Sequence, residues 1–359
     1  MSGFEIEDVG SGAMANFRSD EPFVVQVSGR TLVIGEHRFD GEVLIRPHEP
    51  FVFRINDKPY RGHLRLRADE DGQVFEAVNL VPLESYLFGV IGAEMPSYWE
   101  PEALKAQAVA SRTYCLFIKD RFGQRRSWDL TQSESSQVYR GLEAETQTVR
   151  AAVLATAGEV LVAPADDGRD LIIATYYSSS CGGHTEAAEN VFGGERVAPL
   201  GGVRCRDCAG VARHSHYYWK PVTMTMQQIS EKLMRRYPAL EKLERISNFK
   251  VSKLGYKGRV VRVKLIGKNA ATDTVRGEDF RLTLDPTGRK IKSAIFTVEK
   301  NGNKVSFQNG LGFGHGAGLC QCGAQGMARQ GKTYKDILSY YFPGSKRVTI
   351  TPAKTTTEL

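Results

Sequence analysis

The sequence predicts an α+β protein in which antiparallel strands and hairpins pack with helices around a cleft, with an added α/β lobe. Three observations support this class. Residues 23–77 alternate apolar and polar side chains in short runs separated by turn residues, which is typical of antiparallel strands. Residues 80–122 change to helical spacing. Residues 212–300 then mix one helical pattern with several strand patterns, which indicates a lobe of its own.

Composition places the chain among ordinary globular proteins and excludes several classes. Of its 359 residues, 41% are hydrophobic and 25% are charged, and the net charge is +7. The basic residues form no stripe with interleaved aromatics, so we expect no nucleic-acid partner. No stretch approaches the roughly 18 apolar residues of a transmembrane segment. The first residues contain no hydrophobic signal core, so no export signal is visible.

The N-terminal part is expected to pass from disorder to strands to a short helix. Residues 1–20 are rich in Gly, Ser, Asp and Glu, and their composition predicts disorder. The strand patterns follow. Pro82 suits the first turn of a helix, which we expect to end at Gly92.

A longer helix is predicted to begin at Pro101 and to end at Gly123. It is rich in Ala, which allows close approach of neighbouring backbone. Lys105 and Arg112 fall on one face at helical spacing. Arg112 lies among apolar and hydroxyl residues, a setting that calls for a partner. A structural ion pair and a functional cation are equally open readings.

The remaining elements follow from local pattern. Residues 21–211 and 301–345 are expected to form one domain, interrupted by the lobe at 212–300 and followed by a loose tail at 346–359. A Gly-rich loop near residue 315 leads into one or two closing helices. Helices are predicted at 145–159 and 225–237, and strands at 159–165, 171–179, 259–267, 280–284 and 293–300.

Glu94 is a solitary acid in an apolar, Gly-broken stretch between the two helices. It is flanked by Gly92, Ala93, Met95 and Pro96. Apolar surroundings disfavour the charged form of a carboxyl group and raise its pKa. A carboxylic acid that stays protonated near neutral pH can donate a proton to a leaving oxygen. The alternative is a partly solvated linker residue without a function.

Three segments of the chain resemble the SpoIID/LytB family, named for stage II sporulation protein D. The opening segment VPLESYLFGVIGAEMPSYWEPEALKAQAVASRTY is similar to the family's first motif, and GFGHGAGLCQCGAQGMARQGKTYKDILSYYFPG is similar to its closing motif. YYSSSCGGHTE between them also fits. The resemblance covers roughly residues 25–343.

The resemblance implies a lytic transglycosylase that cuts peptidoglycan glycan strands, with a preference for strands stripped of peptides. It places the catalytic acid at Glu94, in the EMP motif, with Lys105 and Arg112 as supporting cations. Such an enzyme needs one acid only, because the C6 hydroxyl of the substrate attacks the anomeric carbon and leaves a 1,6-anhydro end. An ordinary glycosidase needs two carboxyl groups.

Further substrate-binding residues are expected from the family's motifs. Tyr177 and Ser180 could bind sugar or orient Glu94, and His315 and Gly316 could line a sugar cleft. A satisfied strand end and tight backbone packing are the structural alternatives. We also expect Lys105 and Arg112 to receive the free lactyl carboxylate of a stripped strand.

The cysteines suggest a structural metal. Cys205 and Cys208 have C-x2-C spacing, which suits a tetrahedral zinc site. The resemblance adds Cys181 and Cys320 as the other ligands, with His184 as a substitute and Cys322 as a spare. No cofactor is expected for catalysis. A Cys205–Cys208 disulfide and free buried thiols remain open, and Cys115 is expected to be a small core residue.

Other functions remain open as well. Some relatives are non-catalytic enhancers of a cell-wall amidase, although retention of the acid and both cations favours the enzyme. A hydrolase with Glu186 or Glu189 as the second carboxylate would give reducing ends. In each case peptidoglycan is the expected partner and an extracytoplasmic location is expected.

Overall fold

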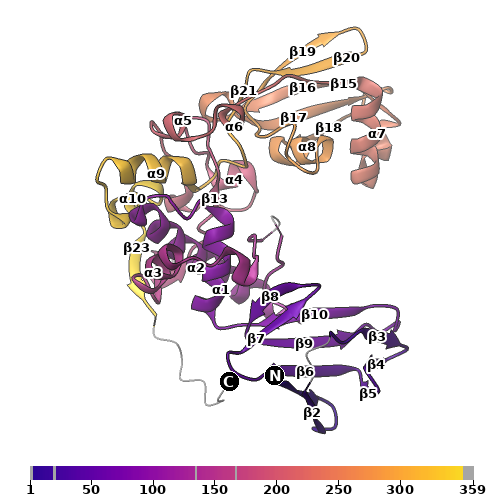
Figure 1. Ribbon diagram of the computed structural model, residues 1–359. Helices are drawn as coiled ribbons and strands as arrows, with labels where there is room; N and C mark the ends of the chain where they lie inside the picture. The colour runs from indigo at the N-terminus through magenta and orange to yellow at the C-terminus, as the bar shows by residue number, and fades with distance from the viewer. Residues whose placement is uncertain (1–2, 19–21, 134–135, 166–167, 351–359) are drawn as a thin grey trace. The chain divides into compact units, whose positions relative to one another are not determined.

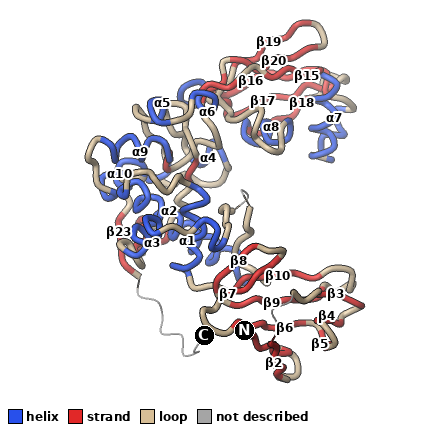
Figure 2. The backbone as a smooth tube through the Cα atoms, viewed as in Figure 1, coloured by secondary structure: helices blue, strands red, loops and turns tan. Residues whose placement is uncertain are grey.

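The computed structural model describes residues 3–18, 22–133, 136–165 and 168–350 (Figure 1). The chain divides into two compact units. Unit 1 comprises Met1–Tyr98 and Cys115–Ala157, and unit 2 comprises Trp99–Tyr114 and Gly158–Leu359. Figure 2 shows helices and strands in both units, and most strand pairs are antiparallel, which confirms the predicted α+β class.

A five-stranded antiparallel sheet, in the order β10-β9-β6-β1-β2, organises the first part of unit 1. The three-stranded sheet β3-β4-β5 packs on it, and its Leu32 and Ile34 share one core with Ile6 and Val43. The hairpin β7-β8 completes this part. The strands are β1 Gly3–Asp8, β2 Met14–Arg18, β3 Val25–Ser28, β4 Thr31–Ile34, β5 His37–Asp40, β6 Glu42–Pro47, β7 Val52–Ile55, β8 Lys58–Arg61, β9 His63–Ala68 and β10 Phe75–Leu80.

Residues 3–18 form two strands and a turn, in contrast to the disorder predicted for residues 1–20, of which 1–2 and 19–20 lie outside the described residues. Strands β1 and β2 pair with each other, and β1 also pairs with β6. Ile6 is fully buried and Phe17 nearly so. The composition is polar, but the apolar residues alternate at a period of two, and that alternation lets one face enter the core.

The helices of unit 1 pack around α1, Leu83–Glu94. Helix α3, Gln147–Leu154, and the 3₁₀ turn η2, Gly141–Ala144, both contact α1. The sequence predicted that this helix ends at Gly92, but α1 continues to Glu94. Gly92 lies inside the helix, and glycine is required there because an added Cβ would lie 1.9 Å from the carbonyl oxygen of Ala144.

Helix α2, Pro101–Phe122, begins at the predicted proline and is followed by the 3₁₀ turn η1, Gly123–Arg125. Its first part belongs to unit 2 and its last part to unit 1. No helix within the described ranges is long and apolar enough to cross a membrane.

Outside the lobe, unit 2 consists of small sheets and short helices. Strands β11, β12 and β23 form one sheet, β13 pairs in parallel with β22, and β14 pairs with β21. The strands are β11 Glu159–Pro164, β12 Asp170–Ile172, β13 Tyr177–Ser178, β14 Tyr218–Trp219, β21 Gly310–Leu311, β22 Leu319–Cys320 and β23 Lys346–Thr349. The helices are α4 Ala188–Val191, η3 Ala198–Leu200, α5 Cys208–Val211, α6 His214–Tyr217, α9 Gln321–Arg329 and α10 Tyr334–Tyr341.

The C-terminal part contains the predicted closing helices, but the end of the chain is more ordered than predicted. Thr333 caps α10 in a reciprocal pair with Asp336, which separates it from α9. Residues 346–349 are not loose, because β23 pairs with β11. The rest of the predicted tail, 351–359, lies outside the described residues.

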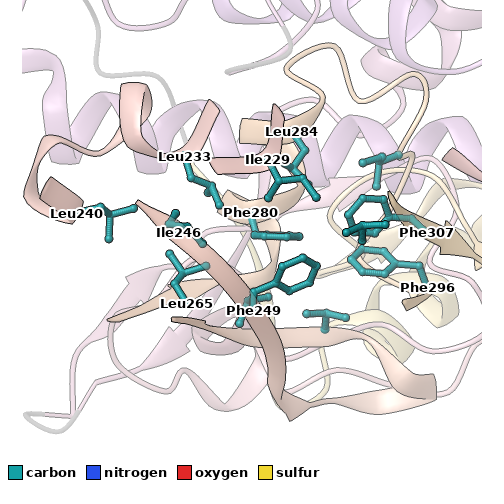
Figure 3. Close-up of a cluster of buried hydrophobic side chains, with 14 of the residues drawn as sticks. Ile229, Leu233, Leu240, Ile246, Phe249, Leu265, Phe280, Leu284, Phe296 and Phe307 are labelled. Carbon is teal, nitrogen blue, oxygen red and sulfur yellow. The ribbon is translucent and has the colours of Figure 1, made fainter. Parts of the chain in front are cut away.

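The lobe, defined here as β15 to β20, contains two three-stranded sheets, β15-β20-β19 and β16-β17-β18. It reaches past the expected boundary at residue 300, since Val305 and Phe307 belong to its core (Figure 3). Its elements are β15 Val222–Thr225, α7 Met226–Arg236, η4 Pro238–Leu243, β16 Ile246–Leu254, η5 Tyr256–Gly258, β17 Val260–Gly267, β18 Thr272–Arg276, α8 Gly277–Leu284, β19 Thr297–Asn301 and β20 Lys304–Gln308.

One strand prediction in the lobe was wrong. Residues 280–284 belong to helix α8. Phe280 and Leu284 are buried four residues apart, whereas Leu282 between them is 39% exposed. The FRLTL pattern therefore follows the helical period and not the strand period. Figure 3 shows Phe280 and Leu284 among the core side chains of the lobe.

Candidate functional site

Glu94 is the last residue of α1 and is half-buried. One carboxylate oxygen, Oε1, accepts a hydrogen bond from the backbone N–H of Val138 at 3.0 Å. The segment that carries Val138 is itself anchored, because Gln137 is fully buried and its Oε1 accepts a hydrogen bond from Tyr86 on α1. Met95, the next residue, is 2% exposed. The carboxyl group of Glu94 is therefore fixed by a backbone hydrogen bond and lies next to a buried apolar residue in the chain.

The other predicted site residues lie in unit 2, and the two predicted cations on α2, Lys105 and Arg112, differ in burial. Lys105 is half-buried and forms an ion pair with Glu102, 2.7 Å between Nζ and Oε1. The other Glu102 oxygen accepts the backbone N–H of Tyr334. Burial favours the neutral form of Glu102, but these two hydrogen bonds outweigh it and lower its pKa.

Arg112 is fully buried, in contrast to the expected cationic stripe open to substrate. Its Nη1 donates to the carbonyl oxygen of Glu159 on β11 at 3.1 Å. The neighbouring residue Thr113 donates to Val109, and its hydroxyl accepts the N–H of Leu161. The start of β11 is thus fastened to α2. This geometry fits a positioning residue better than a residue that contacts a glycan.

The segment 176–180 and the Gly-rich loop form one tightly packed pair. Ser180 and Phe313 exchange backbone hydrogen bonds of 3.0 and 2.8 Å. An added Cβ on Gly314 would lie 2.8 Å from Ser178, and one on Gly318 would lie 2.0 Å from the Tyr176 carbonyl oxygen. The alternating glycines allow this approach, as the structural alternative expected.

His315 is held in one neutral tautomer. Its Nδ1 accepts the N–H of Ala317 at 3.1 Å, so the proton is assigned to Nε2, which donates to the Tyr177 carbonyl oxygen at 2.8 Å. Burial lowers the pKa of His315 to about 4 and outweighs the nearby carboxylate of Glu278. Its ring lies 5.0 Å from Phe192 and 6.2 Å from Tyr176. The imidazole is neutral at pH 7.

Gly316 and Ser180 face the protein interior. An added Cβ on Gly316 would lie 2.2 Å from Nη2 of Arg259, and its N–H donates to Ser178. Ser180 is fully buried near Cys208, whose pKa is lowered mainly by hydrogen bonds from Cys181 and the other cysteines of the group. Neither residue is exposed to a ligand, which differs from the expected sugar contacts. Tyr177 is half-buried, with its ring 6.4 Å from Tyr114.

Sequence reasoning missed a buried charge network between the lobe and the Gly-rich loop. Arg259 is 1% exposed and donates through Nη2 to the Cys181 carbonyl oxygen at 2.8 Å. Burial lowers its pKa, while Glu278 opposes that change. Glu278 is bound by Arg281 through two hydrogen bonds. Nothing in the local sequence signals that Arg259 contacts residues almost 80 positions away.

Glu186, one alternative second carboxylate, has a structural role. It is 1% exposed and accepts hydrogen bonds from the Ala187 and Tyr256 N–H groups and from Asn190. These contacts join α4 to the lobe. Glu189 is half-buried, and its Oε2 is buried without a hydrogen-bond partner among the described residues.

Cys181, Cys205, Cys208 and Cys320 come together as expected. All four are buried, and their Sγ atoms lie within 4.8 Å of one another. A tetrahedral zinc–thiolate site with Zn–S distances of ~2.3 Å has sulfurs about 3.8 Å apart, and Cys181 and Cys208 are 3.8 Å apart. All six cysteines are free. The four residues could hold a metal ion.

The surroundings of these four sulfurs also suit a metal. The Cys181 N–H donates to Cys320 Sγ at 3.3 Å, and the Tyr341 hydroxyl lies 3.2 Å from Cys205 Sγ. Such contacts to thiolates are typical of metal sites. His184 is outside the group, because its Nδ1 lies 2.6 Å from the Thr185 carbonyl oxygen and its ring stacks on Tyr256. Cys322 is also outside, and burial raises its pKa to about 12.

Comparisons with known proteins agree with the motifs. The family model "Stage II sporulation protein" matches residues 71–162, and a model described as a domain of unknown function (DUF8618) matches residues 207–318. The chain is 36% identical to an uncharacterized protein of Brachyspira hyodysenteriae over 341 residues, 92% of this chain and 85% of that protein.

Two named relatives come from Bacillus subtilis. Stage II sporulation protein D is 29% identical over 285 residues, which is 76% of each chain. A protein named amidase enhancer is 26% identical over 298 residues, 72% of this chain and 40% of that protein.

Proposed function

Because the chain belongs to the stage II sporulation protein D family, we propose that it is a lytic transglycosylase that cuts peptidoglycan glycan strands and leaves 1,6-anhydro ends. The observation that carries the proposal is Glu94, a half-buried acid at the end of α1, held through Oε1 by the Val138 N–H. Peptide-stripped strands are the proposed substrate, and the wall side of the membrane is the proposed location.

Glu94 serves both halves of the reaction. As an acid it gives its proton to the bridging oxygen while the bond from that oxygen to the anomeric carbon breaks. The C6 hydroxyl of the same sugar then attacks the anomeric carbon and forms the anhydro ring, and the resulting carboxylate takes the hydroxyl proton. No water is consumed, and Glu94 ends the cycle protonated.

The surroundings of Glu94 support an acid that works in both protonation states. The negative end of the α1 dipole and the buried neighbour Met95 favour the neutral form. The Val138 N–H favours the carboxylate.

The other predicted residues, all in unit 2, are proposed to have roles of their own. Arg112 holds the start of β11 and is a positioning residue. Of the two predicted cations, Lys105 is the one that retains exposed surface, and we assign to it the contact with a substrate carboxylate. Within unit 2, His315 and Tyr177 are proposed to offer sugar a neutral imidazole and a half-buried ring.

The four clustered cysteines are proposed to hold a structural zinc ion. Four thiolates complete a tetrahedral set, so the metal would stabilise the fold and take no part in catalysis. Cys181 follows segment 176–180 and Cys320 follows the Gly-rich loop, so the ion would fasten both sides of this packed pair.

A second function is favoured by the relative named amidase enhancer. In that case the chain binds the wall, activates an amidase and cuts no glycan. The product ends of purified, stripped glycan treated with the protein distinguish the functions by mass. Anhydro ends support the transglycosylase, and reducing ends indicate a hydrolase. Uncut strands support the amidase enhancer.

A further inference from the structure

Five basic residues gather on one face of the sheet β16-β17-β18 in the lobe. The strand register pairs Lys250 with Lys264, Lys253 with Arg262, and Arg262 with Arg276. Residues paired across antiparallel strands point to the same side, and Arg262 and Lys264 are two residues apart on β17, so both rows share one face. We call Lys250, Lys253, Arg262, Lys264 and Arg276 the cationic face.

The opposite side of this sheet is the core of the lobe. Phe249, Val263 and Leu265 are buried there with side chains of α7 and α8 (Figure 3). In contrast, Lys250, Lys253 and Lys264 are exposed. The apolar side is thus covered by the lobe itself, whereas the three lysines of the cationic face are open to a partner. Arg262 and Arg276 are half-buried, and Nη1 of Arg262 is buried.

The charges of this face are poorly compensated within the protein. Like charges directly opposite each other on neighbouring strands destabilise a sheet, and this face has three such pairs. Arg276 forms an ion pair with Asp279. Within the described ranges, Lys250, Lys253, Arg262 and Lys264 have no carboxylate within 4 Å. An external anion would relieve this repulsion.

The cationic face connects directly to the predicted sugar-binding segment. Lys253 Nζ donates to the Asn190 side chain at 3.0 Å, and Arg276 Nη1 donates to the Phe192 carbonyl oxygen. The Phe192 ring stacks on Tyr176 with 4.2 Å between centroids and lies 5.0 Å from His315. A row of cations therefore begins beside a group of aromatic rings.

We propose that the cationic face binds a glycan strand whose sugars bear free carboxylates. The two rows lie about 6.6 Å apart along the strands, and their side chains can bind carboxylates by charge-assisted hydrogen bonds. The aromatic rings beside them offer apolar surface to sugar rings. This proposal rests on the proposed function for the identity of the polymer, and it assigns the lobe the role of selecting stripped strands.

The test compares two charge-matched variants of the full chain. Lys250→Gln/Lys264→Gln removes two exposed cations from the face. Arg289→Gln/Lys304→Gln removes two exposed cations elsewhere on the lobe. All proteins carry Glu94→Gln so that strands stay uncut, and the dissociation constant is measured for stripped glycan and for the same glycan with its carboxylates reduced to alcohols.

The face variant should bind stripped glycan roughly ten- to thirtyfold more weakly than the control variant, and the two should bind reduced glycan equally. Equal affinity of both variants for stripped glycan would overturn the proposal. So would an equal loss on reduced glycan, or a loss confined to poly(glycerol phosphate) or DNA. Product ends of the wild-type protein are scored separately, so failure of the enzymatic function is distinguishable from failure of this surface.

Discussion

Arg112 is enclosed on all sides, and at the scale of single residues this burial determines what it can do. A guanidinium with no exposed surface cannot receive a substrate carboxylate, but it can hold β11 through the Glu159 carbonyl oxygen. Removal of a large buried side chain leaves a cavity and an unpaired carbonyl. Activity should therefore depend on Arg112 through structure and not through recognition of the carboxylate.

Arg112→Ala should lower the cleavage of stripped and peptide-bearing strands by the same factor. It should also reduce the free energy of unfolding by about 2–4 kcal/mol. Urea denaturation and initial rates on both substrates measure these effects. Lys105→Ala is the control, with a stability change under about 1 kcal/mol. An Arg112→Ala loss confined to stripped strands would restore direct carboxylate recognition.

His315 makes stability dependent on pH. Burial lowers its pKa to about 4, whereas an unfolded histidine has a pKa of about 6.5. The unfolded chain therefore binds more protons between these values, and the free energy of unfolding falls as the pH drops from 6.5 to 4, by at most roughly 3 kcal/mol. His315→Asn should remove this component.

The comparison is the difference between wild-type and His315→Asn unfolding free energies across that pH range, because His63 and His216 also have lowered pKa values. A constant difference between the two proteins would contradict the buried neutral imidazole.

At the scale of elements, α1 keeps a glycine where local propensity favours alanine. Replacing a helix-interior glycine with alanine gains about 1 kcal/mol on an exposed surface. At Gly92 the new methyl would lie 1.9 Å from the Ala144 carbonyl oxygen. Gly92→Ala should therefore lower the melting temperature in calorimetry. Gly210→Ala, where nothing lies within 4 Å of the added Cβ, is the control. A stabilised Gly92→Ala protein would show that η2 does not pack as described.

At the scale of the whole molecule, the cysteine group joins parts of unit 2 that are up to 139 residues apart. Cys208→Ser should abolish zinc in the purified protein and lower its melting temperature by many degrees, since three thiolates form a weaker site. Cys322→Ser, a change next to the group, should leave the zinc content at one per chain. A metal-free wild-type protein of full stability would exclude the structural metal.

The local sequence pattern predicted many helices and strands of this fold, because their formation depends on the spacing of apolar residues along the chain. Helix α2 begins at Pro101 as the local pattern predicted, and the four cysteines that the family resemblance grouped do lie together. Residues 3–18 and 280–284 were misassigned, since composition hid a two-residue period in one and a short apolar run was ambiguous in the other. Arg259 and the cationic face could not be predicted, because contacts across the fold and strand register create them.

The central claim is that one carboxyl group, Glu94, carries both proton transfers. The most direct test is the rate of anhydro-end formation on stripped glycan for wild type, Glu94→Gln and Glu94→Asp, with folding checked by melting temperature. We expect anhydro ends from the wild type, none from the folded Gln variant, and a greatly slowed reaction from Asp, whose side chain is one methylene shorter. Anhydro ends formed by Glu94→Gln at the wild-type rate would contradict it.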